Sequence, residues 1–258
     1  MSERALVTGA SSGIGDAFAR ALAERGTDLV VVARDQARLR TLEADVLDSH
    51  GITCEVLAAD LTDPAALEAV AQRLASDTEP IDLLVNNAGF GTSGRFVELP
   101  LAGERNEIEL NVVALHRLTH AAVTAMVPRG SGGVINVSSI GGYQPAPGFA
   151  TYSATKAFVS SFTQAIHEEL HGTGVKAMVV CPGFTRTEFQ ARAGAGETSR
   201  LPDFVWQEAG EVVRCALRDY DRGRAVSVPG PLNTALAAFA SIAPGIAGRK
   251  VAAATLGI

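Results

Sequence analysis

Short, uninterrupted apolar runs alternate along this chain with longer segments whose apolar residues recur at helical spacing. A run of this kind, bounded by glycine or by small polar residues, is typical of a strand that is covered on both faces in a parallel sheet. The alternation of the two patterns predicts an α/β domain. The runs occupy residues 4–7, 29–32, 54–58, 81–85, 134–137, 175–181 and 225–228.

The first strand leads directly into a glycine-rich turn and then into a helix. Glycine at positions 9, 13 and 15 would let the backbone approach a pyrophosphate closely, and the helix N-terminus would supply N–H donors. Because the turn joins a strand to a helix, we predict that it binds a dinucleotide. Its spacing, Gly-x-x-x-Gly-x-Gly, differs from the usual Gly-x-Gly-x-x-Gly. The predicted contact residues are Gly9, Ser11, Ser12, Gly13, Ile14 and Gly15.

The end of the second strand bears on the choice of cofactor. An acidic residue there would hold the ribose hydroxyls of NAD, whereas an arginine accommodates the 2′-phosphate of NADP. The strand ends in Ala33-Arg34-Asp35. Arg34 favours NADP(H), and we expect Asp35 to cap the helix that follows. The alternative is that Asp35 holds NAD(H). It stays open because Ser12 occupies the position in the glycine turn where a second basic side chain would strengthen the case for NADP.

Polar residues follow the third and fourth strands. Asp60-Leu61 follows the run 54–58, where the Asp could meet the adenine amino group or merely begin a turn. The fourth run closes with Asn86-Asn87-Ala88-Gly89. Ligands of open α/β sheets bind at the carboxyl ends of the strands. We therefore assign to the cofactor crevice the residues Asp60, Leu61, Asn87, Ala88 and Gly89.

Tyr152 and Lys156 lie four residues apart in a segment whose helical pattern opens near Thr151. On a helix the two side chains share one face, about 6 Å apart along the axis. An ammonium group beside a phenol lowers the tyrosine pKa from about 10 toward neutral pH, and such a tyrosine can exchange a proton with a substrate oxygen. Ser139, just after the run 134–137, could hydrogen-bond the same oxygen. In isolation, Tyr-x-x-x-Lys is more often an ordinary pair on a helix surface.

The composition narrows the function classes. With 258 residues, 47% of them hydrophobic, the chain suits one domain with a large core. A formal net charge of −6 argues against a nucleic-acid surface. Three scattered cysteines, Cys54, Cys181 and Cys215, favour reduced thiols in the cytoplasm over disulfides or a metal cluster. We expect no signal peptide, and no apolar run approaches the length of about 18 residues that would predict a transmembrane helix.

Taken together, these motifs resemble the short-chain dehydrogenases/reductases in their shorter, non-extended branch, over about residues 4–230. The resemblance implies a Rossmann-type doubly wound sheet of seven parallel strands with helices on both faces, in a single domain of residues 1–230. It also implies an NAD(P)-dependent oxidoreductase for a small-molecule carbonyl or alcohol, assembled as a homodimer or homotetramer. It rests on Thr8-Gly9-x3-Gly13-Ile14-Gly15, Asp60, Asn86-Asn87-Ala88-Gly89, Asn111, Ser139, Tyr152-x3-Lys156 and Pro182-Gly183.

The resemblance also implies roles for individual residues. Tyr152 would be the acid/base at the substrate oxygen, Lys156 would lower its pKa and bind the nicotinamide ribose, and Ser139 would orient the carbonyl. Asn111 would complete a proton relay through water, which agrees with its place inside a helix, where Asn is unfavourable. Two threonines resemble positions that hold the nicotinamide carboxamide. The residues assigned to this end of the cofactor are Pro182, Gly183, Thr185 and Thr187.

Two segments bear on the substrate. Residues 188–208 mix aromatic, small and charged side chains, and we expect them to form a substrate lid. Residues 231–258 form an apolar tail at helical spacing, which we expect to pack on the core or on a second subunit. Contact with lipid or with an apolar substrate mouth is the alternative. The tail is similar to branches of the family that act on lipid-like or steroid-like carbonyls.

Three other interpretations remain open at this point. Residues 167–171, His-Glu-Glu-Leu-His, match the His-Glu-x-x-His signature of zinc proteases. Because His167 lies about 16 Å beyond Lys156 along one helix, we expect a polar helix end and no metal site. A nucleotide-binding regulator without turnover is a second alternative, although it would need no tuned phenol. An NAD-dependent alcohol dehydrogenase working in the oxidative direction is the third, and Arg34 and Asp35 discriminate it.

Overall fold

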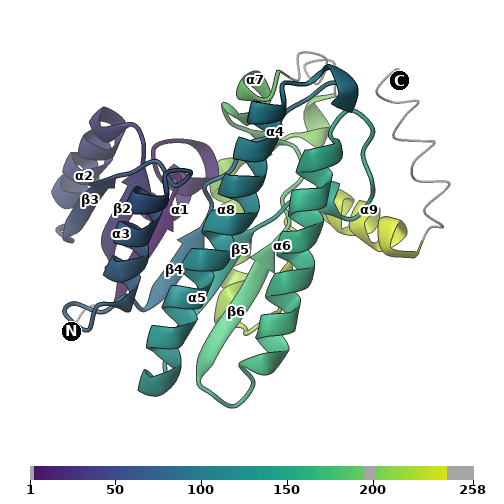
Figure 1. Ribbon diagram of the computed structural model, residues 1–258. Helices are drawn as coiled ribbons and strands as arrows, with labels where there is room; N and C mark the ends of the chain where they lie inside the picture. The colour runs from purple at the N-terminus through teal and green to yellow at the C-terminus, as the bar shows by residue number, and fades with distance from the viewer. Residues whose placement is uncertain (1–2, 195–201, 243–258) are drawn as a thin grey trace.

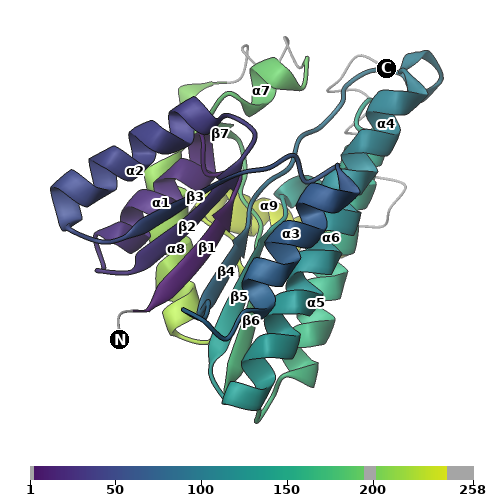
Figure 2. The same ribbon diagram turned by 60° about the vertical axis from the view of Figure 1, so that its left-hand side comes forward.

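A computed structural model describes residues 3–194 and 202–242 of the chain. Its centre is a sheet of seven parallel strands in the order β3-β2-β1-β4-β5-β6-β9, and helices cover both faces (Figure 1 and Figure 2). This arrangement confirms the predicted Rossmann-type doubly wound sheet. The strands are β1 (Arg4–Thr8), β2 (Asp28–Ala33), β3 (Cys54–Ala58), β4 (Leu83–Asn86), β5 (Gly132–Val137), β6 (Val175–Val180) and β9 (Val226–Ser227).

Successive side chains along each central strand enter two different apolar layers. In β1, Ala5 and Val7 face the layer shared with α1, α2 and α8, whereas Leu6 faces the layer shared with α3, α5 and α6. All three residues are fully buried, which explains why the strands are continuous apolar runs. The helices of the two layers are α1 (Gly13–Ala23), α2 (Gln36–His50), α8 (Ala209–Asp221), α3 (Pro64–Ala75), α5 (Leu115–Met126) and α6 (Ala150–Glu169).

Two of the helices begin at aspartate caps. The Asp35 carboxylate accepts a hydrogen bond from the Arg38 backbone N–H at 3.1 Å, and Asp63 accepts one from the Ala66 backbone N–H at 2.8 Å. Pro64 occupies the first turn of α3, where a missing N–H costs nothing. The predicted cap at Asp35 is confirmed, and Asp63 caps α3 in the same way, so β2 and β3 are each followed by a sharply defined helix start.

The helical stretch of residues 101–126 has three parts. α4 (Leu101–Ile108) and α5 are joined by η2 (Glu109–Ala114), a π-helical turn that contains Asn111. The Asn111 side chain donates to the Phe90 carbonyl at 2.8 Å and accepts from the Phe90 N–H at 3.1 Å. This two-way contact with a loop distant in sequence accompanies the wider turn. π-helical turns of this kind are frequent at functional sites.

The strand order reverses between β1 and β4, which pair directly in the middle of the sheet. Open α/β sheets bind ligands beyond the carboxyl ends of the strands at such a reversal. β1 ends at Thr8 and β4 ends at Asn86, so the glycine turn and the Asn86–Gly89 motif meet there. β5 ends close by, just before Ser138 and Ser139.

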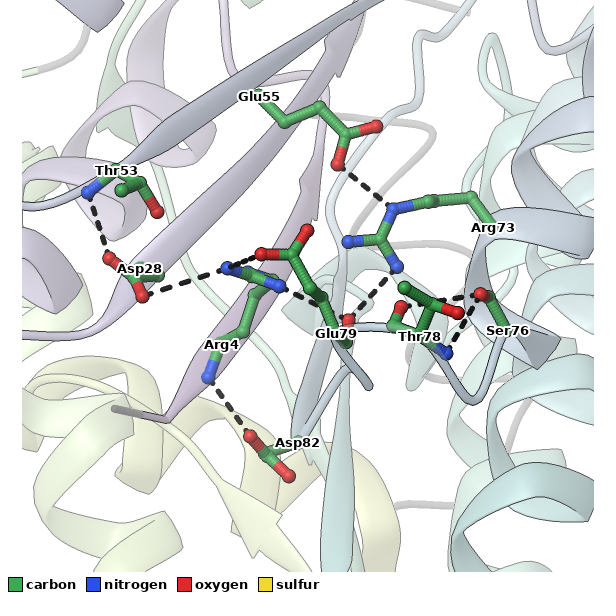
Figure 3. A network of polar contacts seen from close by, with 9 residues as sticks. All are labelled: Arg4, Asp28, Thr53, Glu55, Arg73, Ser76, Thr78, Glu79 and Asp82. Carbon is green, nitrogen blue, oxygen red and sulfur yellow. Dashed lines mark hydrogen bonds and ion pairs between the residues drawn. The ribbon is translucent and has the colours of Figure 1, made fainter. Parts of the chain in front are cut away.

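Polar contacts join the starts of the strands, at the end of the sheet opposite the switch point (Figure 3). Arg4, at the start of β1, donates its backbone N–H to Asp82 at 3.0 Å and its guanidinium to Glu79 at 3.1 Å. Asp28, at the start of β2, accepts the Thr53 backbone N–H at 2.8 Å. These contacts fix the segments that lead into four neighbouring strands, at the end away from the switch point.

The described part of the C-terminal tail is α9 (Pro231–Ile242), and the remaining tail residues lie outside the described chain. Asn233 and Ala237 are buried, and Asn233 donates to the Pro229 carbonyl at 2.8 Å. Leu232, Leu236 and Phe239 are exposed. Within residues 3–194 and 202–242, no helix is long and apolar enough to cross a membrane.

Candidate active site

The three glycine positions in the turn after β1 leave no room for a side chain. Gly9 and Gly13 have φ angles of +66° and +60°, in the left-handed region that favours glycine. A Cβ atom on Gly15 would lie 2.2 Å from the Gly9 carbonyl oxygen. A Cβ atom on Gly13 would lie 3.0 Å from the Thr187 side chain. The turn therefore brings the start of α1 close to the end of β1 and places Thr187 beside the predicted phosphate site.

A buried threonine that the sequence analysis did not assign organises this turn. The Thr8 hydroxyl accepts the backbone N–H groups of Asn87 and Ala88, each at 3.0 Å. In return, the Asn87 side-chain amide donates to the Thr8 carbonyl at 3.0 Å and to the Gly9 carbonyl at 3.3 Å. The ends of β1 and β4 are thus held together by side chains. The threonine at the start of the glycine motif was the only feature of the sequence from which this role could have been predicted.

The residues after β2 and β3 lie together on the cofactor side. Arg34 is largely exposed, and its guanidinium is 3.8 Å from the Asp60 carboxylate. Partial burial raises the pKa of Asp60, but hydrogen bonds from Thr62 and the Arg34 charge outweigh it and hold this pKa below its ordinary value. The carboxylate of Asp35 is engaged in the cap of α2. Of these two residues, Arg34 thus has the more exposed side chain, whereas the Asp35 carboxylate is held in the cap.

Ser139, Tyr152 and Lys156 converge beyond the end of β5. The Ser139 hydroxyl is hydrogen-bonded to the Tyr152 phenol and also accepts the Gly141 backbone N–H at 3.0 Å. The Lys156 ammonium is buried, donates to the Val137 carbonyl at 3.0 Å and lies 5.8 Å from the centre of the Tyr152 ring. The chain thus places a hydroxyl, a phenol and an ammonium group at one strand end.

The neighbouring serine has a different environment. Ser138 is buried, and its hydroxyl donates to the Lys156 carbonyl at 2.7 Å. This bond ties β5 to α6 and leaves the Ser138 hydroxyl directed into the protein. Ser139 is therefore the serine that faces Tyr152.

The predicted direction of the Tyr152 pKa shift was wrong. Burial raises the pKa of Tyr152 to about 12, although the hydrogen bond with Ser139 acts in the opposite direction. Burial also lowers the pKa of Lys156 to about 8, against the opposing effect of the Glu107 carboxylate. The sequence showed the neighbouring charge but not the loss of hydration, which is the larger effect for both groups.

Asn111 and Gly89 link this cluster to the loop after β4. The Asn111 amide donates to the Thr155 hydroxyl at 3.1 Å, in addition to its two bonds with Phe90. A Cβ atom on Gly89 would lie 2.9 Å from the Asn111 side-chain oxygen and 3.4 Å from the Lys156 ammonium. Glycine at position 89 therefore allows the amide and the ammonium group to approach the same backbone segment.

The segment after β6 lies beside the loop that contains Ser139. The Pro182 carbonyl accepts the Ile140 backbone N–H at 3.0 Å, in η4 (Ile140–Gly142). A Cβ atom on Gly183 would lie 2.3 Å from the Asn233 side chain of α9. Thr185 is buried and its hydroxyl donates to the Gly183 carbonyl at 3.0 Å. Pro182, Gly183 and Thr185 thus lie between the Ser139 loop and the start of the C-terminal helix.

The predicted lid segment is described on either side of residues 195–201, which lie outside the described chain. Its first part is α7 (Phe189–Arg192), and its second contains η6 (Asp203–Val205). β7 (Thr185–Arg186) and β8 (Gln207–Glu208) pair across its base. The Phe189 ring lies 5.3 Å from the Tyr152 ring, so an apolar side chain from this segment contacts the phenol directly.

The His-Glu-x-x-His segment ends α6 on the far side. The Nδ1 atom of His167 donates to the Ala177 carbonyl at 2.7 Å. Among the described residues, no group of three or more His, Cys, Asp or Glu side chains could hold a metal ion. The imidazole of His167 thus contacts β6, away from the Tyr152 cluster.

A doubly wound sheet with a glycine turn at its switch point is the architecture of the dinucleotide-binding α/β proteins. Within this class, a family model for short chain dehydrogenases matches residues 3–198, and the chain belongs to the short-chain dehydrogenase/reductase family.

Similar proteins agree with this assignment. A short-chain dehydrogenase from Sphingobium yanoikuyae, solved in complex with NADPH, superimposes with a TM-score of 0.84 and 40% identity over 94% of this chain and 96% of that chain. The bulky-bulky ketone specific alcohol dehydrogenase from Comamonas testosteroni gives a TM-score of 0.80 and 35% identity over 94% of this chain and 95% of that chain. Sulfoacetaldehyde reductase 2 from Chromohalobacter salexigens is 35% identical over 73% of this chain and 75% of that protein.

Proposed function

We propose that this protein reduces a bulky, apolar carbonyl compound with NADPH, and that Tyr152 donates the proton to the substrate oxygen. The observation that carries the proposal is the convergence of Ser139, Tyr152 and Lys156 beyond the end of β5. These three groups match the donors and the charge that a developing alkoxide requires.

The chain's own residues can carry the proton transfer. The high pKa of Tyr152, caused by burial, keeps the phenol protonated, as a proton donor requires. The Ser139 hydroxyl is bonded to the phenol here, and we propose that its single hydrogen turns to the carbonyl oxygen when the substrate is bound. The Lys156 ammonium stabilises the phenolate that remains after transfer. Asn111 is proposed to hold a water that returns a proton toward Lys156.

The residues around the glycine turn fit a dinucleotide. Gly9, Gly13 and Gly15 leave the backbone bare where the pyrophosphate would approach, and α1 begins there. Asp60 and Leu61 would meet the adenine, Asn87, Ala88 and Gly89 the adjoining ribose, and Thr185 and Thr187 the carboxamide. When bound, reduced nicotinamide supplies the hydride.

Arg34 supports NADP over NAD, because Asp35 is engaged in a helix cap and the guanidinium is exposed beside Asp60. We expect Arg34→Ala to weaken NADPH binding by about 10- to 100-fold, the loss of one or two charged hydrogen bonds, with little change for NADH. Fluorescence titration with both cofactors measures this. Arg40→Ala, which removes an exposed charge paired with Glu43 in the same helix, is the matched control. Equal losses for both cofactors would overturn the assignment of NADP, and the NAD-dependent alcohol dehydrogenase would remain as the alternative.

An apolar, bulky substrate is supported by the surroundings of Tyr152. The rings of Phe189 and Phe149 lie 5.3 Å and 6.5 Å from the Tyr152 ring. The Comamonas testosteroni relative is named for bulky ketones. We propose a lipid-like or steroid-like ketone, covered by residues 188–208 acting as a lid. α9, with its exposed Leu236 and Phe239, is proposed to extend the substrate mouth or to contact a second subunit.

We also propose a homodimer or homotetramer built on the long helices. Ile108, Val113 and Phe158, on α4, η2 and α6, are partly exposed large apolar side chains on these elements. The free thiols of Cys54, Cys181 and Cys215 support a reducing, cytoplasmic location.

The proposed activity is tested by NADPH oxidation with a panel of small aldehydes, sugars, ketoacyl thioesters and steroid-like ketones. Turnover of the bulky apolar ketones above the small aldehydes supports the proposal. NADPH binding without turnover of any member would instead favour a nucleotide-binding regulator. Failure to bind NADPH would overturn the cofactor assignment.

A further inference from the structure

Two buried glutamates lie behind the Tyr152 cluster, and the proton transfer described above does not use them. Glu104 and Glu107, one turn apart on α4, are 4% and 0% exposed. The Thr92 hydroxyl lies between them: it contacts Oε1 of Glu104 and is 2.7 Å from Oε2 of Glu107. The Thr151 hydroxyl contacts the other oxygen of Glu104, and the Thr92 backbone N–H donates to Oε2 of Glu107 at 2.8 Å.

The hydrogen count at Thr92 limits the charge of this pair. A threonine hydroxyl has one hydrogen to donate, whereas an ionised carboxylate only accepts. If Glu104 and Glu107 were both ionised, one of the two contacts with Thr92 would join two oxygens with no hydrogen between them. If one carboxyl is protonated, it donates to the Thr92 oxygen while Thr92 donates to the other. Both contacts are then hydrogen bonds, and moving the proton reverses the two donors.

The charge balance of the surroundings points the same way. Lys156 is 5% exposed, and Glu107 interacts electrostatically with both Lys156 and Tyr152. The charged or titratable groups acting on Glu107 are Glu104 from α4 and Lys156 from α6; Lys156 in turn also faces the Cys181 thiol after β6. The Lys156 ammonium together with two ionised carboxylates would leave one buried negative charge in excess. If Glu104 and Glu107 share one proton, the three side chains together are neutral.

Glu107 is the member of the pair whose charge acts on Lys156 and Tyr152. Among the described residues, the Oε1 atom of Glu107 has no hydrogen-bond partner, although it is fully buried. Glu107 also precedes Asn111 by four residues, across the start of the π-helical turn. Burial and the charge of Glu104 raise the pKa of Glu107, against the effects of Thr92 and Lys156.

We propose that Glu104 and Glu107 share one proton across the Thr92 hydroxyl, and that the single negative charge of the pair is the buried counter-charge of the Lys156 ammonium. Glu107 is then a positioning residue, which acts on Tyr152 through Lys156. The consequence for turnover rests on the proposed function, because it requires that Lys156 assists Tyr152. The charge sharing itself does not depend on turnover.

The chain allows a direct test, because it contains three lysines, Lys156, Lys176 and Lys250. In protein labelled with ¹³C at the lysine Cε, three signals report ammonium titration, and Lys176→Arg and Lys250→Arg identify two of them. Glutamine at either glutamate imitates the protonated member and leaves the charge on the other. We therefore expect each single variant, Glu104→Gln or Glu107→Gln, to change the Lys156 pKa little, and the double variant to lower it by about one unit or more.

The outcomes separate the alternatives. Nearly additive shifts in the two single variants would show that both carboxylates are ionised and would overturn the shared proton. An unchanged Lys156 pKa in the double variant would overturn the counter-charge. Glu109→Gln, which removes an exposed carboxylate from the adjoining turn, is the control for net charge. Because Lys156 must stay charged, the alkaline loss of activity should begin at lower pH in the double variant only.

A second measurement tests the shared proton even if the double variant does not fold. Infrared spectra of the wild-type protein at neutral pH should show a protonated carboxyl band that each single glutamine variant loses. Persistence of the band in both variants, or its absence from the wild type, would contradict the proposal. Neither the lysine nor the infrared signal needs a substrate. A protein that shows both signals but never oxidises NADPH would therefore overturn the proposed function alone.

Discussion

Tyr152→Phe should reduce kcat/KM for carbonyl reduction by about 10²- to 10⁴-fold, the range in which a positioned general acid contributes. The substitution removes only the phenolic oxygen that donates the proton, while the ring keeps its contacts with Phe189 and Phe149. NADPH affinity and thermal stability should therefore stay close to those of the wild type. Steady-state NADPH oxidation, with cofactor titration on the same samples, measures both.

Tyr220→Phe is the matched control for this prediction. Tyr220 is also poorly exposed, and burial raises its pKa as well, but it packs on the layer of α1, α2 and α8 away from Ser139. The same chemical change there should leave kcat/KM nearly unaltered. Retention of most activity in Tyr152→Phe would show that another group protonates the substrate.

Gly15→Ala should destabilise the protein and abolish most dinucleotide binding. The new Cβ would lie 2.2 Å from the Gly9 carbonyl oxygen and 2.5 Å from the Asn87 amide, so the turn and α1 must separate. We expect a loss of unfolding free energy on the order of 3 kcal/mol, which corresponds to a fall in melting temperature of roughly 6 to 12 °C. NADPH affinity should fall by more than about tenfold.

Gly210→Ala tests the specificity of that effect. Gly210 lies in α8 without a positive φ, and a Cβ there would meet only the end of the flexible Arg214 side chain, at 3.4 Å. Because Ala favours the helix, the control should be neutral or slightly stabilising. Normal stability and cofactor binding in Gly15→Ala would contradict the close approach of β1 and α1.

The layer structure and much of the site geometry could be predicted from the sequence because they depend on local patterns. Apolar runs marked the buried strands, and aspartates such as Asp35 marked helix starts. The sign of the Tyr152 pKa shift could not, because it depends on burial by segments distant in sequence. Glu104 and Glu107 were missed for the same reason: a glutamate in a helix ordinarily faces solvent, and only Thr92 and Thr151, contributed by other segments, reveal that these two do not.

The polar contacts around Arg4 and Glu79 lie at the end of the sheet opposite the active site. They lie at the starts of the strands (Figure 3). Tyr152 and the glycine turn lie beyond the carboxyl ends of the strands, at the other end of the sheet. Glu79 is largely exposed. A linker, label or fusion joined near position 79 would therefore leave the carboxyl ends of the strands uncovered. The protein could be immobilised through position 79 with its active site facing the solution.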